Sequence, residues 1–169
     1  MEFSKRKNIR LKKYVYSENG AYFITVCTKD KQKFLGHIVG GGAFDAPKVI
    51  LSPQGKIVGK YILSTNNIPN LNVDKYVIMP NHIHLILAGS REAILEFFNA
   101  FRQRIIRIFR NLGVMADWSK FQASILPIDS LKSLRNEIIY VNRNAFVACS
   151  DYTPQNYLWG GGCAYFSSL

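Results

Sequence analysis

The 169-residue chain has few cysteines and no long apolar run. Its three cysteines, Cys27, Cys149 and Cys163, are odd in number and widely spaced, which favours free thiols in a reducing cytoplasm over a disulfide framework. No apolar stretch has the length needed to span a bilayer, and the basic N-terminus lacks the apolar segment of a secretory signal. We therefore expect a cytoplasmic protein with no membrane partner.

Motifs of several enzyme classes are also absent from the sequence. The glycines Gly40–Gly42 are not followed by Lys-Ser or Lys-Thr, so a phosphate-binding P-loop is not predicted. No Cys-x-x-Cys or His-Glu-x-x-His pattern indicates a zinc site. A histidine-triad nucleotide hydrolase would have a third histidine where this chain has Ile86, which disfavours a metallohydrolase of small nucleotides.

Acidic residues are scarce: the chain has 11 Asp and Glu against 22 Lys and Arg, a formal net charge of +11. Such an excess favours a polyanionic partner, most often nucleic acid, over a charge that serves solubility alone. The candidate phosphate contacts lie in an N-terminal arm and on the polar face of a helix. The alternative is that both segments are only exposed to solvent. They are Lys5, Arg6, Lys7, Arg10, Lys12, Lys13, Arg102, Arg104, Arg107 and Arg110.

Hydrophobic residues make up 48% of the chain, enough for the core of one domain, and their periodicity predicts both strands and helices. Ser52 and Pro53 predict the start of a helix, and Asp129 or Ser130 predicts the cap of another. We expect a strand at 20–28, two antiparallel strands within 72–87 joined near Pro80, helices at 94–112 and 127–148, and a C-terminal tail packed on the body.

The segment "YVIMPNHIHLIL", residues 76–87, carries two histidines on one predicted strand. Side chains alternate along a strand, so His82 and His84 point to one face while Ile83 and Leu85 point to the core. Two imidazoles spaced in this way can bind one divalent metal ion. The alternative is a pair of core histidines that are only hydrogen-bonded.

A tyrosine and an asparagine share one face of the last predicted helix. Tyr140 and Asn144 are four residues apart. The amide oxygen of Asn144 suits Mg²⁺ or Mn²⁺ as a third ligand, and the phenol of Tyr140 becomes a nucleophile once it is deprotonated. Taken alone, the two residues are better explained as an ordinary half-buried tyrosine and a residue near a helix end; the histidine pair and the basic charge shift the balance toward a site.

These motifs resemble those of a known family. "YVIMPNHIHLIL" resembles the HUH motif of single-tyrosine transposases, in which U is a large apolar residue, here Ile83. "YVNRN" is similar to the Y-x-x-x-N-P motif of the REP-associated tyrosine transposase branch, with Ala145 at the proline position. "RKNIRLKKYVYSENGAYFITVCT" resembles the arm and first strand of that branch, so the resemblance extends roughly from Lys5 to Ala148.

The resemblance implies an α+β fold, a ferredoxin-like antiparallel sheet with helices packed on one face. It divides the chain into a basic arm at 1–20, a catalytic domain at 21–150, and a tail at 151–169 whose apolar end is that expected of a truncated chain.

It also implies an activity. His82, His84 and Asn144 would hold Mg²⁺ or Mn²⁺, and Tyr140 would attack a phosphodiester of single-stranded DNA beside a hairpin. A 5′-phosphotyrosine and a free 3′-hydroxyl would form, and rejoining would follow; the protein would act as a monomer or a dimer. Two alternatives remain: a catalytically inactive or domesticated relative that only binds DNA hairpins, and an RNA-binding α+β module that stacks bases on aromatic residues.

Overall fold

The computed structural model describes residues 20–41, 47–65, 68–111, 113, 122–148 and 156–162. The predicted arm, with its candidate contacts from Lys5 to Lys13, lies outside these residues, and so does most of the predicted tail. The domain boundaries at residues 20 and 150 therefore stay predictions.

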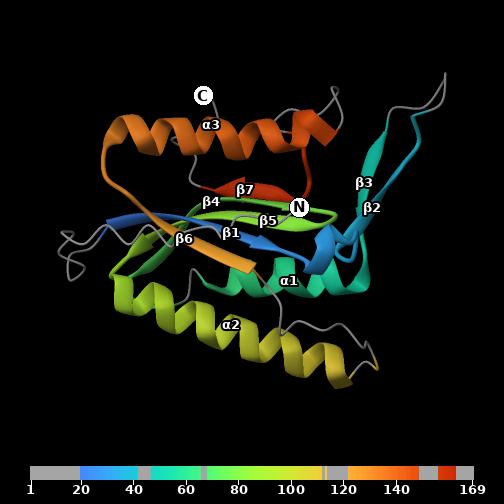
Figure 1. The fold of residues 1–169 in the computed structure, drawn as a ribbon, viewed down its shortest axis with the longest axis horizontal. Coiled ribbons are helices and arrows are strands. Elements are labelled where there is room, and N and C mark those ends of the chain that lie inside the picture. Colours follow the sequence, from blue (N-terminus) through green and yellow to red (C-terminus); the bar gives the residue numbers. More distant parts are fainter. Residues whose placement is uncertain are drawn as a thin grey trace, which may run out of the picture.

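Within the described part, five strands form one antiparallel sheet in the order β6-β1-β5-β4-β7 (Figure 1). They are β1 (Gly20–Cys27), β4 (Leu71–Met79), β5 (His82–Gly89), β6 (Gln122–Ile128) and β7 (Gly160–Gly162). Apart from an inserted ribbon, the elements β1, α1, β4, β5, α2 and β6 follow one another as β-α-β-β-α-β, the ferredoxin-like series. The predicted α+β class with an antiparallel sheet is thus confirmed.

Helices cover both faces of this sheet (Figure 1). Helices α1 (Pro53–Ser64) and α2 (Arg91–Asn111) pack against each other and against β4 and β5 on one face, as predicted. Helix α3 (Leu131–Ala148) follows the ferredoxin-like series and packs on β4, β5 and β6 from the opposite side. The sheet is therefore the middle layer of three, and among the described helices only α3 covers its face. The prediction of helices on one face holds for α1 and α2, whereas α3 lies on the opposite face.

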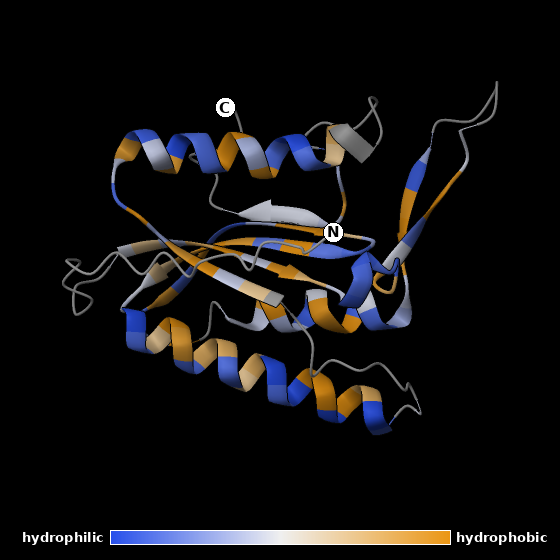
Figure 2. Cartoon of the chain, viewed as in Figure 1, coloured by the Kyte–Doolittle hydropathy of each residue, from blue (hydrophilic) through white to orange (hydrophobic). Residues whose placement is uncertain are grey.

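The alternation of β5 decides which residues meet which helix. Ile83 and Leu85 are fully buried and lie on the side of α1, because Gly59 of α1 approaches Ile78, the neighbour of Ile83 on β4. Residues 82, 84 and 86 project to the other side, toward α3. On the α1 side, the buried residues of α2 recur every three or four positions, which gives the helix its alternating hydrophobic and hydrophilic segments in Figure 2. They are Ile94, Phe97, Phe98, Phe101, Ile105 and Phe109.

The start of α1 matches its sequence signals. The Ser52 hydroxyl accepts a hydrogen bond from the Gly55 amide at 3.1 Å and donates one to the Phe34 carbonyl at 2.9 Å, and Pro53 occupies the first helical position. A side chain at Gly55 would collide with the carbonyl of Leu35, so glycine is required there. Ser52 thus joins the helix to the segment before the ribbon.

A two-stranded antiparallel ribbon, β2 (Gly36–Val39) and β3 (Lys48–Leu51), projects from the body beside α1 (Figure 1). The Leu35 amide donates to the Pro80 carbonyl at 2.8 Å, and the Trp159 indole donates to the Val49 carbonyl at 2.9 Å. These contacts fix the base of the ribbon to the β4–β5 turn and to the C-terminal segment.

The structure corrects the sequence prediction in two places. The cap predicted at Ser130 is confirmed, because its hydroxyl accepts a hydrogen bond from the Ser133 amide at 3.1 Å and the helix begins at Leu131. The predicted segment 127–148 is too long at its start, because Pro127 belongs to the edge strand β6. The glycines Gly160–Gly162 form the other edge strand, β7. The predicted packing of the tail is confirmed for its described residues, since the Tyr157 hydroxyl donates to the Ile78 carbonyl at 2.7 Å.

None of the helices that the structure describes has both the length and the apolar character that a membrane crossing requires.

Candidate active site

The two histidines predicted to share a face lie side by side on β5 and face α3. Their ring centroids are 4.8 Å apart, and the planes meet at 69°. His84 is 4% exposed, because its ring stacks on Phe23 of β1 with centroids 5.3 Å apart. The Thr25 hydroxyl lies 2.9 Å from Nδ1 of His84, across the β1–β5 pair. Both rings are therefore held by the central strands of the sheet.

Helix α3 brings the tyrosine and the asparagine to these histidines. Oδ1 of Asn144 lies 3.1 Å from Nε2 of His82. The Tyr140 ring stands edge-on against His84 and Phe23, with centroid distances of 5.1 and 5.9 Å. Tyr140 is 50% exposed, so a large substrate can reach its side chain. The structure thus brings together the four residues singled out from two segments almost 60 residues apart.

Both ring nitrogens of His82 face amide oxygens. Nδ1 lies 2.7 Å from Oδ1 of Asn81, and Nε2 lies 3.1 Å from Oδ1 of Asn144. Each amide is oriented by its other end: Asn81 Nδ2 donates to the Lys31 carbonyl at 3.3 Å, and Asn144 Nδ2 donates to the Tyr140 carbonyl at 2.8 Å. A neutral imidazole has one N–H and can satisfy only one of these oxygens. The lone pair of the other ring nitrogen then faces a lone pair of an amide oxygen, and a cation bound between them removes this repulsion.

Burial keeps both imidazoles neutral. Burial and, to a smaller extent, the neighbouring His82 lower the pKa of His84 to about 3. Burial also lowers the pKa of His82; its contact with Asn144 opposes this effect, and the positive charge of Lys31 adds to it. The neutral ring is the form of histidine that binds metal ions.

The donor set fits a hard divalent cation. Mg²⁺ binds its ligands at about 2.1 Å, so two adjacent ligands of an octahedral ion are about 3 Å apart; the His82–Asn144 separation of 3.1 Å matches this spacing. Within the residues that the structure describes, no group of three or more His, Cys, Asp or Glu side chains is placed to hold a metal. A metal at His82 and His84 would therefore rely on the amide oxygen of Asn144, and most of its coordination positions would remain for phosphate oxygens and water.

The predicted arginine contacts lie elsewhere. Arg102, Arg104, Arg107 and Arg110 are all exposed on α2, which packs on the face of the sheet opposite to α3 (Figure 1). They cannot touch a phosphate held at the histidines, although they remain candidates for contacts with a longer nucleic acid.

Sequence reasoning missed the residues that support the site. Lys31 lies in a short 3₁₀ helix, η1 (Lys29–Lys31). Its backbone carbonyl accepts a hydrogen bond from the side-chain amide of Asn81, and its positive charge lowers the pKa of His82. Thr25 contacts His84 only because β1 pairs with β5. The one local signal was the asparagine that directly precedes His82 in the sequence.

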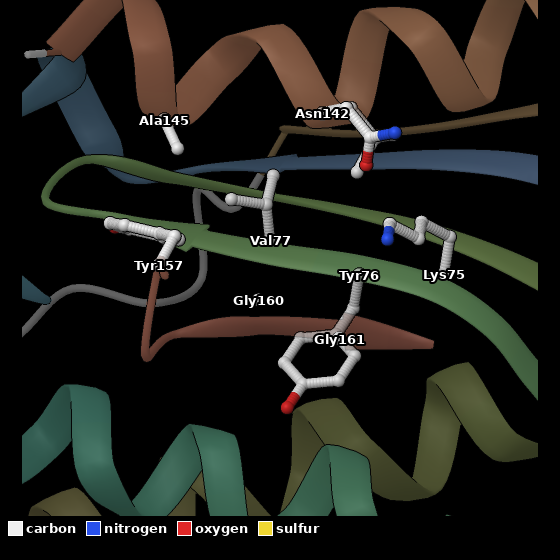
Figure 3. Close-up of a pocket in the computed structure, with 9 residues that line it drawn as sticks. Lys75, Tyr76, Val77, Asn142, Ala145, Tyr157, Gly160 and Gly161 are labelled. Atoms are coloured by element: carbon white, nitrogen blue, oxygen red, sulfur yellow. The ribbon is translucent and has the colours of Figure 1, made fainter. Parts of the chain in front are cut away.

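A small cavity lies on the other flank of α3, between this helix, β4 and β7 (Figure 3). Asn142 of α3 stands above Lys75 of β4 there. Lys75 is 5% exposed, and burial lowers the pKa of its ammonium group. Val77, which also lines the cavity, pairs with His84 on the adjacent strand. A buried lysine in a strand is not marked by any sequence pattern, and it was not predicted.

Comparison with known proteins gives partial similarities. No protein-family model matches the chain. A Haemophilus influenzae protein described as uncharacterized is 38% identical over 87 residues, which span 48% of this chain and 43% of that protein. The chain thus matches less than half the length of this relative.

Two solved structures are similar in fold. A REP-associated tyrosine transposase bound to a REP hairpin is 14% identical with a TM-score of 0.48, covering 80% of this chain and 72% of the other. A candidate transposase from Deinococcus radiodurans is 15% identical with a TM-score of 0.46, covering 79% and 95% respectively. At these values the two structures do not decide the function of this chain.

Proposed function

We propose that this protein is a transposase that cleaves and rejoins single-stranded DNA at hairpin-bearing ends, with Tyr140 as the nucleophile and a divalent metal ion as cofactor. The observation that carries the proposal is the meeting of His82 Nε2 and Asn144 Oδ1 at 3.1 Å, one helical turn from a half-exposed tyrosine. A structural pair of core histidines would need only one amide oxygen beside a neutral His82 ring, whereas both of its ring nitrogens face one.

The reaction exchanges one phosphate ester for another. The Tyr140 hydroxyl loses its proton to solvent, and its oxygen forms a bond to the phosphorus of the scissile phosphodiester. The bond from phosphorus to the 3′ oxygen breaks, and that oxygen takes up a proton as a free 3′-hydroxyl. The products are a 5′-phosphotyrosine link and a 3′ end, and attack by another 3′-hydroxyl reverses the step. No external energy source is needed, because the ester bond is conserved.

The residues of the site divide this work. His82, His84 and Asn144 would hold Mg²⁺ or Mn²⁺, which would polarise the phosphate and stabilise the charge that develops on it. The Tyr140 ring is held edge-on by His84 and Phe23, which limits the orientations of its hydroxyl. Because α3 carries both Tyr140 and Asn144, the nucleophile and one metal ligand are fixed by the same helix.

The proposed partner follows from charge and from the motif resemblance. A net charge of +11 favours a polyanion, and the resemblance to REP-associated tyrosine transposases points to DNA hairpins with a flanking single strand. The oligomeric state stays open between monomer and dimer.

The test compares three proteins on end-labelled single-stranded hairpin DNA from the flanks of the source gene, with Mn²⁺ present. We expect a covalent adduct on a denaturing gel for the wild type and for Tyr61→Phe, a control tyrosine of α1 on the other face of the sheet. We expect none for Tyr140→Phe, while its hairpin binding persists. Its stability should change by about 1 kcal/mol or less, because Tyr140 is half-exposed and loses only a hydroxyl.

Two outcomes would count against the proposal. An adduct that persists in Tyr140→Phe would place the nucleophile elsewhere. Absence of the adduct from all three proteins, with hairpin binding intact, would favour the non-catalytic hairpin-binding alternative.

A further inference from the structure

We propose that Asn81 is a positioning residue that sets the tautomer of His82, keeping the ring proton on Nδ1 so that Nε2 offers its lone pair toward Asn144. The inference rests on the proposed function only for its consequence, metal binding. The position of the proton on the His82 ring does not depend on that function. Asn81 touches no reacting group; it acts through the histidine that follows it.

Asn81 is itself fixed at both its side chain and its backbone. Its Oδ1 lies 2.7 Å from Nδ1 of His82, and its Nδ2 donates to the Lys31 carbonyl at 3.3 Å. Its backbone carbonyl accepts the amide of Thr28 at 3.0 Å and the hydroxyl of Thr28 at 2.9 Å. The amide therefore cannot turn over without losing the contact with Lys31, and its oxygen stays on the histidine.

The carbonyl that orients Asn81 is presented by an unusual turn. Asp30 and Lys31 have φ values of 50° and 54°, the left-handed region that side-chain-bearing residues rarely adopt. Two successive residues in this conformation persist only where the surroundings hold them. Here the turn is held by the Thr28–Asn81 hydrogen bonds and directs the Lys31 carbonyl at the amide of Asn81.

Two oxygens compete for the one proton of His82. The contact with Asn81 is 2.7 Å and that with Asn144 is 3.1 Å, so the proton belongs on Nδ1, the side of the shorter contact. Without the Asn81 oxygen, Asn144 is the remaining amide acceptor. The proton would then move to Nε2 and be donated to Asn144, which would occupy the nitrogen lone pair that a metal needs.

His84 lacks such control. Its Nδ1 faces the Thr25 hydroxyl, which can either donate or accept a hydrogen bond. Thr25 therefore holds the ring in place but permits both tautomers. Of the two histidines, only His82 has its proton position imposed by its neighbour, which is why Asn81 and not Thr25 is assigned this role.

The direct test is ¹⁵N NMR of histidine-labelled protein without DNA and with a chelator, at a pH above the histidine range. The variants are Asn81→Ala, Asn81→Asp, which keeps an acceptor, and Asn72→Ala, which makes the same change at the exposed far end of the β4–β5 pair. We expect His82 to be protonated at Nδ1 in the wild type, in Asn72→Ala and in Asn81→Asp. In Asn81→Ala the proton should move to Nε2. A wild-type ring protonated at Nε2, or no change in Asn81→Ala, would overturn the inference.

Mn²⁺ titration of the same proteins followed by EPR separates this inference from the proposed function. Loss of a hydrogen-bonded neighbour of a metal-binding histidine lowers metal affinity by about 10–100-fold, and we expect this for Asn81→Ala with recovery in Asn81→Asp. If the wild type binds no Mn²⁺ while the tautomer result holds, the proposed function fails and the role of Asn81 stands. If Mn²⁺ binds equally to wild type and Asn81→Ala, the role of Asn81 fails and the proposed function stands.

Discussion

His84 has almost no access to water. Phe23 stacks on it, Tyr140 stands edge-on to it, and Thr25 contacts its Nδ1. The exclusion of water disfavours the charged ring, which is why burial lowers the pKa of His84 to about 3. The side chain is suited to ligate a cation, and it makes the folded state sensitive to acid.

This sensitivity predicts a pH dependence of stability. The unfolded His84 binds a proton below its ordinary pKa of 6.5, whereas the folded one does not until about 3, so stability is lost as pH falls through this window. With a chelator present, we expect wild type to lose about 2 kcal/mol more than His84→Gln between pH 7 and pH 5, measured by urea unfolding.

The comparison with His84→Gln isolates this histidine. Burial also lowers the pKa of His82, so this residue contributes to the loss of stability with the same sign in both proteins. Asp74 and Glu137, whose pKa values burial raises, contribute with the opposite sign in both. Equal losses in wild type and variant would mean that His84 is protonated in the folded state at pH 5, contrary to its burial.

Single residues of the site differ in how far the sequence reveals them. His82, His84, Tyr140 and Asn144 could be chosen because strand and helix periods place each pair on one face. Thr25, 59 residues from His84, becomes its neighbour only through strand pairing, which no local pattern specifies. The roles of Asn81 and Lys31 depend on amide orientation and on a turn with positive φ, which are likewise properties of the folded chain.

Among the helices, α2 and α3 have separate surfaces. Helix α3 faces the histidines, whereas α2 packs on the other side of the sheet and exposes its arginines to solvent. Arg104 and Arg107 are therefore expected to contribute to DNA binding through phosphates remote from the one that Tyr140 attacks.

This separation predicts different effects on binding and on chemistry. Replacing Arg104 and Arg107 with alanine should flatten the dependence of log K on log salt by about 0.7 for each contact with single-stranded DNA. The cleavage rate at saturating DNA should stay unchanged, because neither side chain reaches the histidines. Fluorescence anisotropy over a salt series and single-turnover cleavage measure the two quantities.

The matched control is the pair Arg104→Lys and Arg107→Lys, which keeps the charges and should keep the slope. An unchanged slope in the alanine variant would mean that Arg104 and Arg107 face solvent and do not contact DNA phosphates. A large fall in the saturated cleavage rate would contradict the separation of the two faces.

Elements with strong periodicity were predicted, and the two edge strands were not. The β4–β5 hairpin and α2 have long apolar patterns that tertiary contacts reinforce. Strand β6 contains Pro127, which is tolerated because an edge strand has one side without pairing partners. Strand β7 consists of three glycines, whose strand conformation is imposed by pairing with β4.

For the molecule as a whole, the three layers explain how one small domain could combine binding and chemistry. The sheet fixes the histidines, α3 supplies the tyrosine and the asparagine from one side, and the basic helix α2 covers the other side. A net charge of +11 would draw a polyanion to either surface. The α+β architecture followed from the sequence pattern and the resemblance, but the placement of α3 opposite α2 did not.

The most direct test of tyrosine-mediated cleavage is to identify the residue that carries the DNA. Wild-type protein would be incubated with single-stranded hairpin DNA and Mn²⁺, digested with trypsin and nuclease, and analysed by mass spectrometry. Cleavage after Arg135 and Arg143 releases the peptide NEIIYVNR, in which Tyr140 is the only tyrosine. We predict a 5′-phosphonucleotide on this peptide, attached at Tyr140. A nucleotide on any other peptide, or none on any peptide while the hairpin is bound, would contradict the proposed function.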